Sequence, residues 1–543
     1  MFLPFPSFAN PFRRKKARLE TAHHIPEVDR AVHLLQKGLL DEALSEAKEG
    51  LASSMRRAAT RSIAAYSLNL GLLYRYRGEN DSALDYCFRG LAKFEKLGKK
   101  AEMATCCNNI GLLYRDKGEL NVAMEFFRRG MALAEEAENV LEFAASISNI
   151  GTIQQMKGDF ETASAHFERS LKIFEEIGND LHACEPLHNL IQLAVLEGSP
   201  ARAQPYLNRL EELDNKEENR LISHIYRLSK AKVLKTSERF AKRAEAYLIL
   251  QQIIQEPPVW FDTIVAAKSS LCEVLIGDLG TATDVEAIVE LQDLLKQLLD
   301  VAEAQGNVPL LAETYWLQAK MALIKLEVKQ ARQLLAQAQV IAEKRGLRTL
   351  AMIISSEYDS LLGQMARLDD FIDTEASIRE QLDPSTLEDL VAGMIGKGTT
   401  IPTQLSEEPV MLLVLSSSNQ CVFSRPFIPE SQVDDQVIGG FLHAVRDIGK
   451  QIFTESEMID RIVYKEYILA LKMLDSITFC YAFKGQSYSA LQKLDQFMEK
   501  IYASPSIWNA FAQDIVISQD MTPEEKTEIE DHIRDIFYSP ADQ

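Results

Sequence analysis

Residues 104–118, ATCCNNIGLLYRDKG, and residues 119–138, ELNVAMEFFRRGMALAEEAE, decide the fold of this chain. In both segments the apolar residues recur every three or four positions, which predicts two amphipathic helices. Gly118 lies between them, where a helix can end on a residue with left-handed backbone geometry because glycine has no Cβ. The two segments therefore predict a helical hairpin.

The same hairpin recurs along the chain with a period of forty residues. Small and polar residues mark the period in three ladders: Gly38, Gly78, Gly118, Gly158 and Gly198; Ala43, Ala83, Ala123, Ala163 and Ala203; and Asn69, Asn109, Asn149 and Asn189. Gly71 and Ala83 are small residues in the two helices of one hairpin, so they permit a close helix crossing. Self-similarity at a fixed period is typical of solenoids, in which each hairpin buries its apolar face against the next.

This pattern resembles the tetratricopeptide repeat family. The residues that match its signature are Leu70, Gly71, Tyr74 and Ala83, and again Ile110, Gly111, Tyr114 and Ala123. The period of forty is similar to that of the longer-helix repeats in kinesin light chains and Partner-of-Inscuteable adaptors. Two features depart from the family. In the fourth repeat Gln154 stands in place of the signature tyrosine, and the proline that ends many repeats of the family is absent. The resemblance covers residues 25–215 and implies an α-solenoid of five repeats.

The resemblance also implies a peptide-binding groove on the concave side of the solenoid. In this family an asparagine of the first helix bonds the backbone of an extended peptide, and an amide offers the donor and the acceptor that a peptide unit needs. The peptide-binding residues carried over to this chain are Asn69, Asn109, Asn149, Asn189, Arg75, Arg115, Leu72, Leu112 and Gln155. The two arginines suit a carboxylate. In the alternative, the asparagines bond a neighbouring repeat and only order the stack.

The remaining helical sequence is less regular. Residues 216–383 lose the strict period and are expected to continue the solenoid as degenerate repeats, with a helix pair over 312–346. A ladder of arginines in the second helices, Arg89, Arg129, Arg169 and Arg209, is interpreted as solvated or bonded between repeats. Residues 1–24 form a basic, aromatic and proline-rich tail, and residues 384–408 form a linker.

The pattern of apolar residues changes in residues 409–502, where it predicts strands as well as helices. Segments 411–415 and 421–427 predict a β-hairpin, 434–453 a helix, 459–485 three strands and 487–502 a closing helix. This order of elements resembles the longin and profilin-like folds, with a related layout in roadblock domains. Within the tail 503–543, Thr522 is expected to cap an amphipathic helix that docks on the preceding domain or on a partner. The predicted fold is thus mainly α: a tetratricopeptide-type solenoid, a small longin/profilin-like α/β domain and a C-terminal helix.

Composition argues against several classes of function. A net charge of -20 is unfavourable for nucleic-acid binding, which needs a surplus of lysine and arginine on one face. The seven cysteines include no Cys-x-x-Cys pair, which predicts free thiols in a reducing compartment and no zinc site. The sequence contains no run of eighteen uncharged apolar residues, so it predicts no transmembrane helix. We therefore expect a cytoplasmic protein.

Catalytic motifs are missing from the sequence. Gly396-Lys397 lacks the remaining residues of a P-loop, and no HExxH, GxSxG or GxGxxG motif occurs. Glu185 and His188 share a helix face, but Pro186 and the lack of further ligands argue against a metal site. We predict no catalytic residues, no metal and no cofactor.

The sequence thus predicts a non-enzymatic adaptor that binds a peptide or protein segment in its groove. The alternative is a regulator or effector of small GTPases that acts through residues 409–502. The partner expected for these residues is a small GTPase or a second copy of the chain. The basic cluster within 13–18 is interpreted as a tail, with contact to an anionic membrane as the other reading.

Overall fold

The computed structural model describes residues 30–31, 34, 39–216, 219–256, 261–279, 285–325, 327–372, 407–416, 421–428, 461–464, 467–475, 477–512 and 522–538, with side chains up to 362 in the helix that ends at Ile372. The chain divides into two compact units. The first comprises residues 1–325, 337–350 and 397–401, and the second residues 326–336, 351–396 and 402–543.

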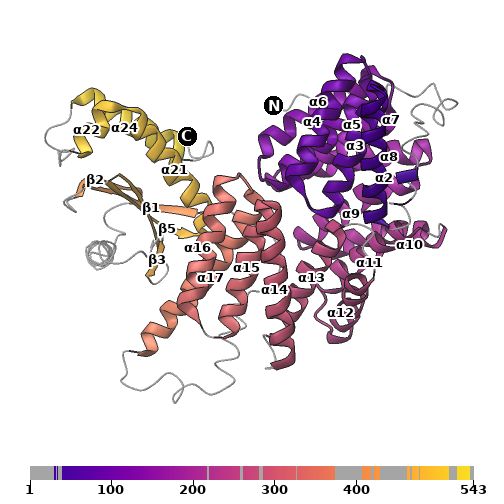
Figure 1. Ribbon diagram of the computed structural model, residues 1–543. Coiled ribbons are helices and arrows are strands. Elements are labelled where there is room, and N and C mark those ends of the chain that lie inside the picture. Colours follow the sequence, from indigo (N-terminus) through magenta and orange to yellow (C-terminus); the bar gives the residue numbers. More distant parts are fainter. Residues whose placement is uncertain are drawn as a thin grey trace. The chain divides into compact units, whose positions relative to one another are not determined.

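The first unit is a succession of helix pairs (Figure 1). Its helices are α2 Leu40–Arg56, α3 Thr60–Arg77, α4 Asn80–Lys96, α5 Lys100–Asp116, α6 Leu120–Glu136, α7 Val140–Met156, α8 Phe160–Ile177, α9 Asp180–Leu196, α10 Pro200–Lys216, α11 Arg220–Leu234, α12 Phe240–Gln255, α13 Phe261–Leu279, α14 Val285–Gln305 and α15 Val308–Ile324. Helix α16, Val328–Lys344, begins in the second unit and ends in the first. The odd-numbered helices α3 to α15 are called helices A, and the even-numbered helices α4 to α16 are called helices B. Helix α17, Arg348–Ile372, begins in the first unit and continues in the second.

The helical period extends further than the residue ladders. Helices A begin at residues 60, 100, 140, 180 and 220, forty apart, and then at 261 and 308, with α17 following at 348. The successive intervals after 220 are therefore 41, 47 and 40 residues. The predicted solenoid is confirmed, and helices continue in pairs where the sequence similarity fades. That these later pairs are degenerate repeats stays a prediction. The first helix of the first predicted repeat lies largely outside the described residues.

Glycine ends the helices A at the predicted places. Gly78, Gly118, Gly158 and Gly198 have φ values of 81°, 74°, 79° and 67°, in the left-handed region that side chains with a Cβ rarely adopt. The large residues of the signature fill the space between helices: Leu70 and Phe127 are fully buried and Tyr74 is buried. The sequence signature therefore marks both the turns and the core of each pair.

The curvature of the stack follows from the contacts among the helices. Each helix A contacts the next, from α3 with α5 to α13 with α15, whereas helices B contact mainly helices A. Because the stack is tighter on the side of helices A, this side is its inner face. Here "the inner face" denotes the side of helices α3, α5, α7, α9, α11, α13 and α15 on which these contacts lie.

The later helices of the first unit contact the earlier repeats. The Arg75 guanidinium lies 2.8 Å from the Asp262 carboxylate, and the Asn80 amide donates to the Gln305 carbonyl at 3.1 Å. Arg345 pairs with Glu119, and the Thr349 hydroxyl donates to the backbone carbonyl of Gln155. These contacts join helices that are about 190 to 230 residues apart in the chain.

The second unit contains a five-stranded antiparallel sheet in the order β2-β1-β5-β4-β3. Its strands are β1 Glu407–Leu415, β2 Cys421–Pro426, β3 Arg461–Tyr464, β4 Tyr467–Leu474 and β5 Ile477–Gly485. The hairpin and the three later strands agree with the prediction, and the helix predicted at 434–453 lies outside the described residues. The likeness to longin or roadblock domains stays a prediction.

Three helices cover one face of this sheet (Figure 1): α21 Ser487–Ala503, α22 Pro505–Ala512 and α24 Pro523–Phe537. Both faces of β1 are nevertheless buried, since Leu412 and Val414 join the core under the helices while Leu413 and Leu415 join a second apolar cluster. This fits the uninterrupted apolar run of the strand, which is typical of a strand buried on both sides.

The C-terminal helix docks as predicted. Thr522 and Glu525 form a capping box, in which the Glu525 N–H donates to the Thr522 hydroxyl at 3.3 Å and the Thr522 N–H donates to the Glu525 carboxylate at 3.0 Å. Ile529, Ile533 and Phe537 are buried against the sheet and α21. The apolar stripe of α24 therefore completes the core of its own unit.

Candidate binding site on the inner face

The asparagine ladder lies at one register of four successive helices A. Asn69 in α3, Asn109 in α5 and Asn149 in α7 are 5%, 8% and 6% exposed, and Asn189 in α9 is half-buried. The Asn109 amide donates to the Thr105 carbonyl of its own helix at 3.0 Å. The Asn69 amide nitrogen is buried without a hydrogen-bond partner among the described residues. In the described part of the chain, no ladder amide bonds a neighbouring repeat.

The bonds that order the stack come from the residue next to the ladder. The Asn108 amide donates to the Glu142 carboxylate of α7 at 2.7 Å, and Ser146 donates to the Asn108 carbonyl oxygen at 2.8 Å. Thr105 donates to the same Glu142 carboxylate at 2.8 Å. Asn108 thus performs the stacking role that the sequence left open for its neighbour Asn109.

The other predicted residues lie on the same helices. Leu72, Leu112 and Arg115 are half-buried, and Gln155 is buried with its backbone carbonyl held by Thr349. Arg75 keeps only 10% of its side chain exposed. The structure therefore brings the predicted set together along α3, α5, α7 and α9, and the returning helices of residues 261–350 narrow access to part of it.

Two arginines and three carboxylates on α3, α5, α9 and α13 form a charged group, called here the acidic group: Arg75, Arg115, Asp116, Glu185 and Asp262. Arg115 binds Asp116 through two N–H groups at 2.6 and 2.9 Å, and Arg75 binds Asp262. Burial raises the pKa of Glu185, and the nearby guanidinium groups of Arg115 and Arg75 offset only part of this rise. Glu185 is nevertheless solvent-exposed. Water therefore reaches its side chain, although neighbouring parts of the protein partly enclose it.

A second charged group, called here the basic group, lies on α11, α13 and α15: Lys232, Lys235, Glu273, Glu313 and Lys320. Lys235 binds Glu273 at 2.6 Å, and Glu313 accepts a hydrogen bond from Ser269. Burial and the neighbouring Lys235 lower the pKa of Lys232 to about 8. Burial also lowers the pKa of His188, on α9, to about 3, so this histidine is neutral in its 2.7 Å bond with Ser229.

Sequence reasoning missed the residues of the basic group, although the period contained a signal for two of them. Residues 232 and 235 lie forty positions after 192 and 195, which continue the register of Leu72 and Arg75. The forty-residue period could not predict the positions of Glu273 and Glu313, because the repeat lengthens by one residue before α13 and by seven before α15.

Replacing Lys232 with methionine is expected to stabilise the protein below pH 8. The folded pKa of about 8 lies below the unfolded value of 10.5, so the unfolded state binds protons more tightly and the wild type loses stability as pH falls through this window. The gain should be at most about 3 kcal/mol at pH 6.5 and should shrink towards pH 10. Urea unfolding of both proteins across this range measures it. An equal gain at all pH values would show that lost charge is not the cause.

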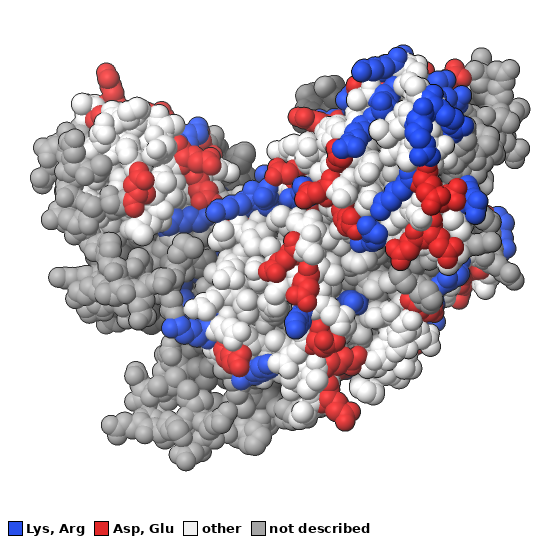
Figure 2. Space-filling model, viewed as in Figure 1, with Lys and Arg blue, Asp and Glu red and all other residues white. Residues whose placement is uncertain are grey.

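The outer surface carries the arginine ladder of helices B. Arg129 pairs with Glu95 of the preceding repeat at 2.5 Å, Arg209 lies 3.4 Å from Glu175, and Arg89 pairs with Asp85 in its own helix. Figure 2 shows lysine and arginine side chains next to acidic ones on the face of these repeats that is in view. The ladder is solvated or bonded between repeats, as predicted.

Metal-ligating and thiol side chains are candidates for catalytic chemistry, and length and apolar content decide whether a helix can span a membrane. No three His, Cys, Asp or Glu side chains among them come together as a metal site requires. Burial raises the pKa of Cys87 to about 12 and that of Cys107 to about 11, so these thiols are poor nucleophiles. Among the described helices, none has the length and apolar content needed to cross a bilayer.

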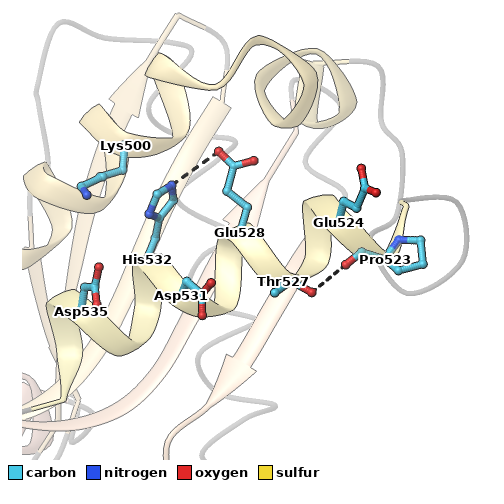
Figure 3. Close-up of a pocket in the computed structure, with 8 residues that line it drawn as sticks. All are labelled: Lys500, Pro523, Glu524, Thr527, Glu528, Asp531, His532 and Asp535. Carbon is cyan, nitrogen blue, oxygen red and sulfur yellow. Dashed lines mark hydrogen bonds and ion pairs between the residues drawn. The ribbon is translucent and has the colours of Figure 1, made fainter.

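The second unit has one shallow hollow on its surface (Figure 3), of about 560 Å³. Lys500 of α21 lines it together with an exposed side of α24, where His532 lies 3.7 Å from Glu528 and Thr527 donates to the Pro523 carbonyl at 2.8 Å. Its remaining acidic side chains are exposed, and Asp531 pairs with Arg534 at 3.0 Å. Nothing in this arrangement points to a particular ligand, so the inner face of the first unit is the better candidate site.

Comparison with known proteins agrees with the helical repeat. The tetratricopeptide repeat family matches residues 61–136, which span α3 to α6. Similar solved structures include a Rap protein complexed with the competence and sporulation factor (15% identity, TM-score 0.39, 56% of this chain and 74% of that chain) and the Rap conjugation gene regulator of plasmid pLS20 in complex with a Phr peptide (14%, 0.39, 59% and 96%). A putative kinesin light chain from Podosopora anserina is also similar (16%, 0.28, 36% and 95%). Curated protein sequences give no match.

The family match and the observed helix pairs agree with the signature residues in the sequence. The two pairs α3–α4 and α5–α6 carry the Leu-Gly or Ile-Gly, tyrosine and alanine positions at which the family was recognised. Residues 61–136 of this chain are therefore tetratricopeptide repeats.

Proposed function

We propose that this chain is a non-enzymatic adaptor that binds a peptide or protein segment on the inner face of its first unit. Tetratricopeptide repeats generally act as protein-interaction scaffolds, and the ladder Asn69, Asn109, Asn149 and Asn189 places amides at regular intervals along that face. An extended peptide presents carbonyl and N–H groups at similar regular intervals, so ladder amides can bond its backbone without regard to its side chains.

The unsatisfied amide of Asn69 is the observation that carries this proposal. A side chain that is 5% exposed with a donor lacking any partner among the described residues is costly, unless a water or a ligand accepts its hydrogen bond. The Arg75 Nε and the Ser148 hydroxyl, on the same set of helices A, are buried without a partner in the same sense. A peptide backbone would supply the missing acceptors.

The test is selection from a random peptide library displayed on phage, with the full chain as bait. The wild type should enrich a family of related peptides, and the double variant Asn109→Ala, Asn149→Ala should bind them at least tenfold more weakly, since each lost backbone hydrogen bond contributes about 1 kcal/mol. Asn208→Ala is the matched control, because Asn208 is exposed on α10. A folded double variant that selects the same peptides with the same affinity would contradict the proposal.

A second candidate function, regulation of a small GTPase by residues 409–502, rests on the order of strands and helices along the chain. The observed five-stranded sheet with α21 after its last strand is consistent with that order. Nucleotide-exchange assays with GTPases from the same cell test it, and no binding to any of them removes it.

A further inference from the structure

Glu185 and Lys232 lie close to the predicted peptide-binding positions of helices A. Glu185 lies one helical turn before Asn189, so the two share a face of α9. Lys232 lies forty residues after Gln192 and continues in α11 the register of Leu72 and Leu112. Both side chains therefore belong to the surface on which a bound segment is proposed to lie.

Glu185 is the unpaired carboxylate of the acidic group. It has no hydrogen bond or ion pair among the described residues, because the arginines beside it bind Asp116 and Asp262. Two guanidinium groups and three carboxylates give the acidic group a formal charge of -1. Pro186, the next residue, has no N–H for the hydrogen bond that a helix normally makes to the carbonyl of His182, one turn back. The acidic group therefore offers hydrogen-bond acceptors and needs one more positive charge to be neutral.

Lys232 is the unpaired ammonium of the basic group. Among the described residues it has no hydrogen bond or ion pair, because Lys235 binds Glu273 and Ser269 donates to Glu313. Lys320 lies over the Trp316 ring, 4.3 Å from its centroid. Three ammonium groups and two carboxylates give the basic group a formal charge of +1. The basic group therefore offers a hydrogen-bond donor and needs one more negative charge to be neutral.

We infer that the inner face selects a dipolar segment, with a lysine or arginine side chain or an amino terminus at Glu185 and a carboxylate at Lys232. This inference rests on the proposed function. The counterpart of Glu185 in α11 is Ile225, seven residues before Lys232, which is about 10 Å along the helix axis. Neighbouring helices are 8–10 Å apart, so the backbone positions of the two residues are separated by roughly 14 Å. An extended peptide covers this distance in about four residues.

Charge reversal on the full chain tests the inference with the same displayed peptide library. Peptides enriched by the wild type should carry a basic and an acidic residue about four positions apart. Glu185→Lys should remove the preference for the basic residue, and Lys232→Glu should remove the preference for the acidic one. Each variant should bind a wild-type peptide at least tenfold more weakly. Glu125→Lys and Lys96→Glu, at exposed positions of helices B, are the matched controls and should leave the selection unchanged.

The outcomes separate this inference from the proposed function. If both folded charge variants select the same charge pattern as the wild type while the asparagine double variant loses binding, the dipolar segment is ruled out and the adaptor stands. If the asparagine double variant also binds as the wild type does, or the wild type enriches no peptide, the inner-face site itself is overturned. Circular dichroism of each variant confirms that the helices are retained.

Discussion

Replacing Asp359 with alanine is expected to destabilise the second unit by about 3–5 kcal/mol, the range for removing one partner of a buried ion pair. Arg461 of β3 is fully buried, and its guanidinium donates to the Asp359 carboxylate at 2.9 Å. Without Asp359 this charge would be left in a place that water does not reach. The guanidinium also lies 4.4 Å from the centroid of the Tyr358 ring and 3.1 Å from the Ser355 hydroxyl, and neither of these two groups carries a charge.

Asp359 also holds the start of α21. The backbone N–H of Ser487 donates to the second carboxylate oxygen at 2.9 Å, and its hydroxyl donates to the first. The first N–H groups of a helix have no partner within the helix, so the carboxylate acts as a cap from another part of the chain. One side chain of α17 therefore joins a strand and a helix that lie 102 and 128 residues away in the sequence.

Urea unfolding monitored by hydrogen exchange measures the effect, with amides of β3, β4 and α21 as reporters. Ser356→Ala is the control, since Ser356 is half-buried on the same helix, and it should change stability by less than about 0.5 kcal/mol. The double variant Asp359→Leu, Arg461→Met should lose less than the sum of its single variants, because it removes both charges of the ion pair together. Full additivity would show that the two residues do not act as a pair.

The sequence could predict those parts of the fold that depend on near neighbours. Period, capping and alternation are local properties, and they located the helix pairs, the five strands and the helix cap at Thr522. The Arg461–Asp359 pair had no such signal, because Asp359 in its helix looks like any acidic residue on a solvated face. The same holds for the pair of Arg75 with Asp262, which depends on how many hairpins complete a turn of the solenoid.

The candidate site shows the same division. The asparagine ladder follows from the period, and so do Lys232 and Lys235 once the period is carried one repeat further. Which of the two asparagines orders the stack was not predictable, since Asn108 and Asn109 are adjacent and chemically identical. Only the position of Glu142 on the next helix decides that Asn108 makes this contact. The charge balance of the site also requires knowing which carboxylates the arginines already bind.

The two glycines Gly71 and Gly277 are expected to respond to alanine in opposite directions. A Cβ at Gly71 would lie 2.4 Å from the Cys87 sulfur and 3.2 Å from the Ala83 carbonyl oxygen and the Cys87 nitrogen. Two of these atoms belong to the backbone of α4, so the helices must move apart, which should cost about 3 kcal/mol. A Cβ at Gly277, in α13, meets nothing within 4 Å, and alanine there should stabilise the helix by up to about 1 kcal/mol.

Hydrogen exchange of amides in α3, α4 and α13 in both variants measures these changes locally. A further variant separates the causes of the Gly71→Ala effect: adding Cys87→Ala removes the sulfur but leaves the backbone atoms of α4 in place. Rescue should therefore be partial, because the carbonyl of Ala83 and the nitrogen of residue 87 still lie within 3.2 Å of the new Cβ. Complete rescue would mean that only a side chain limits the crossing, and then the glycine of the repeat signature would not be required by the approach of the two backbones.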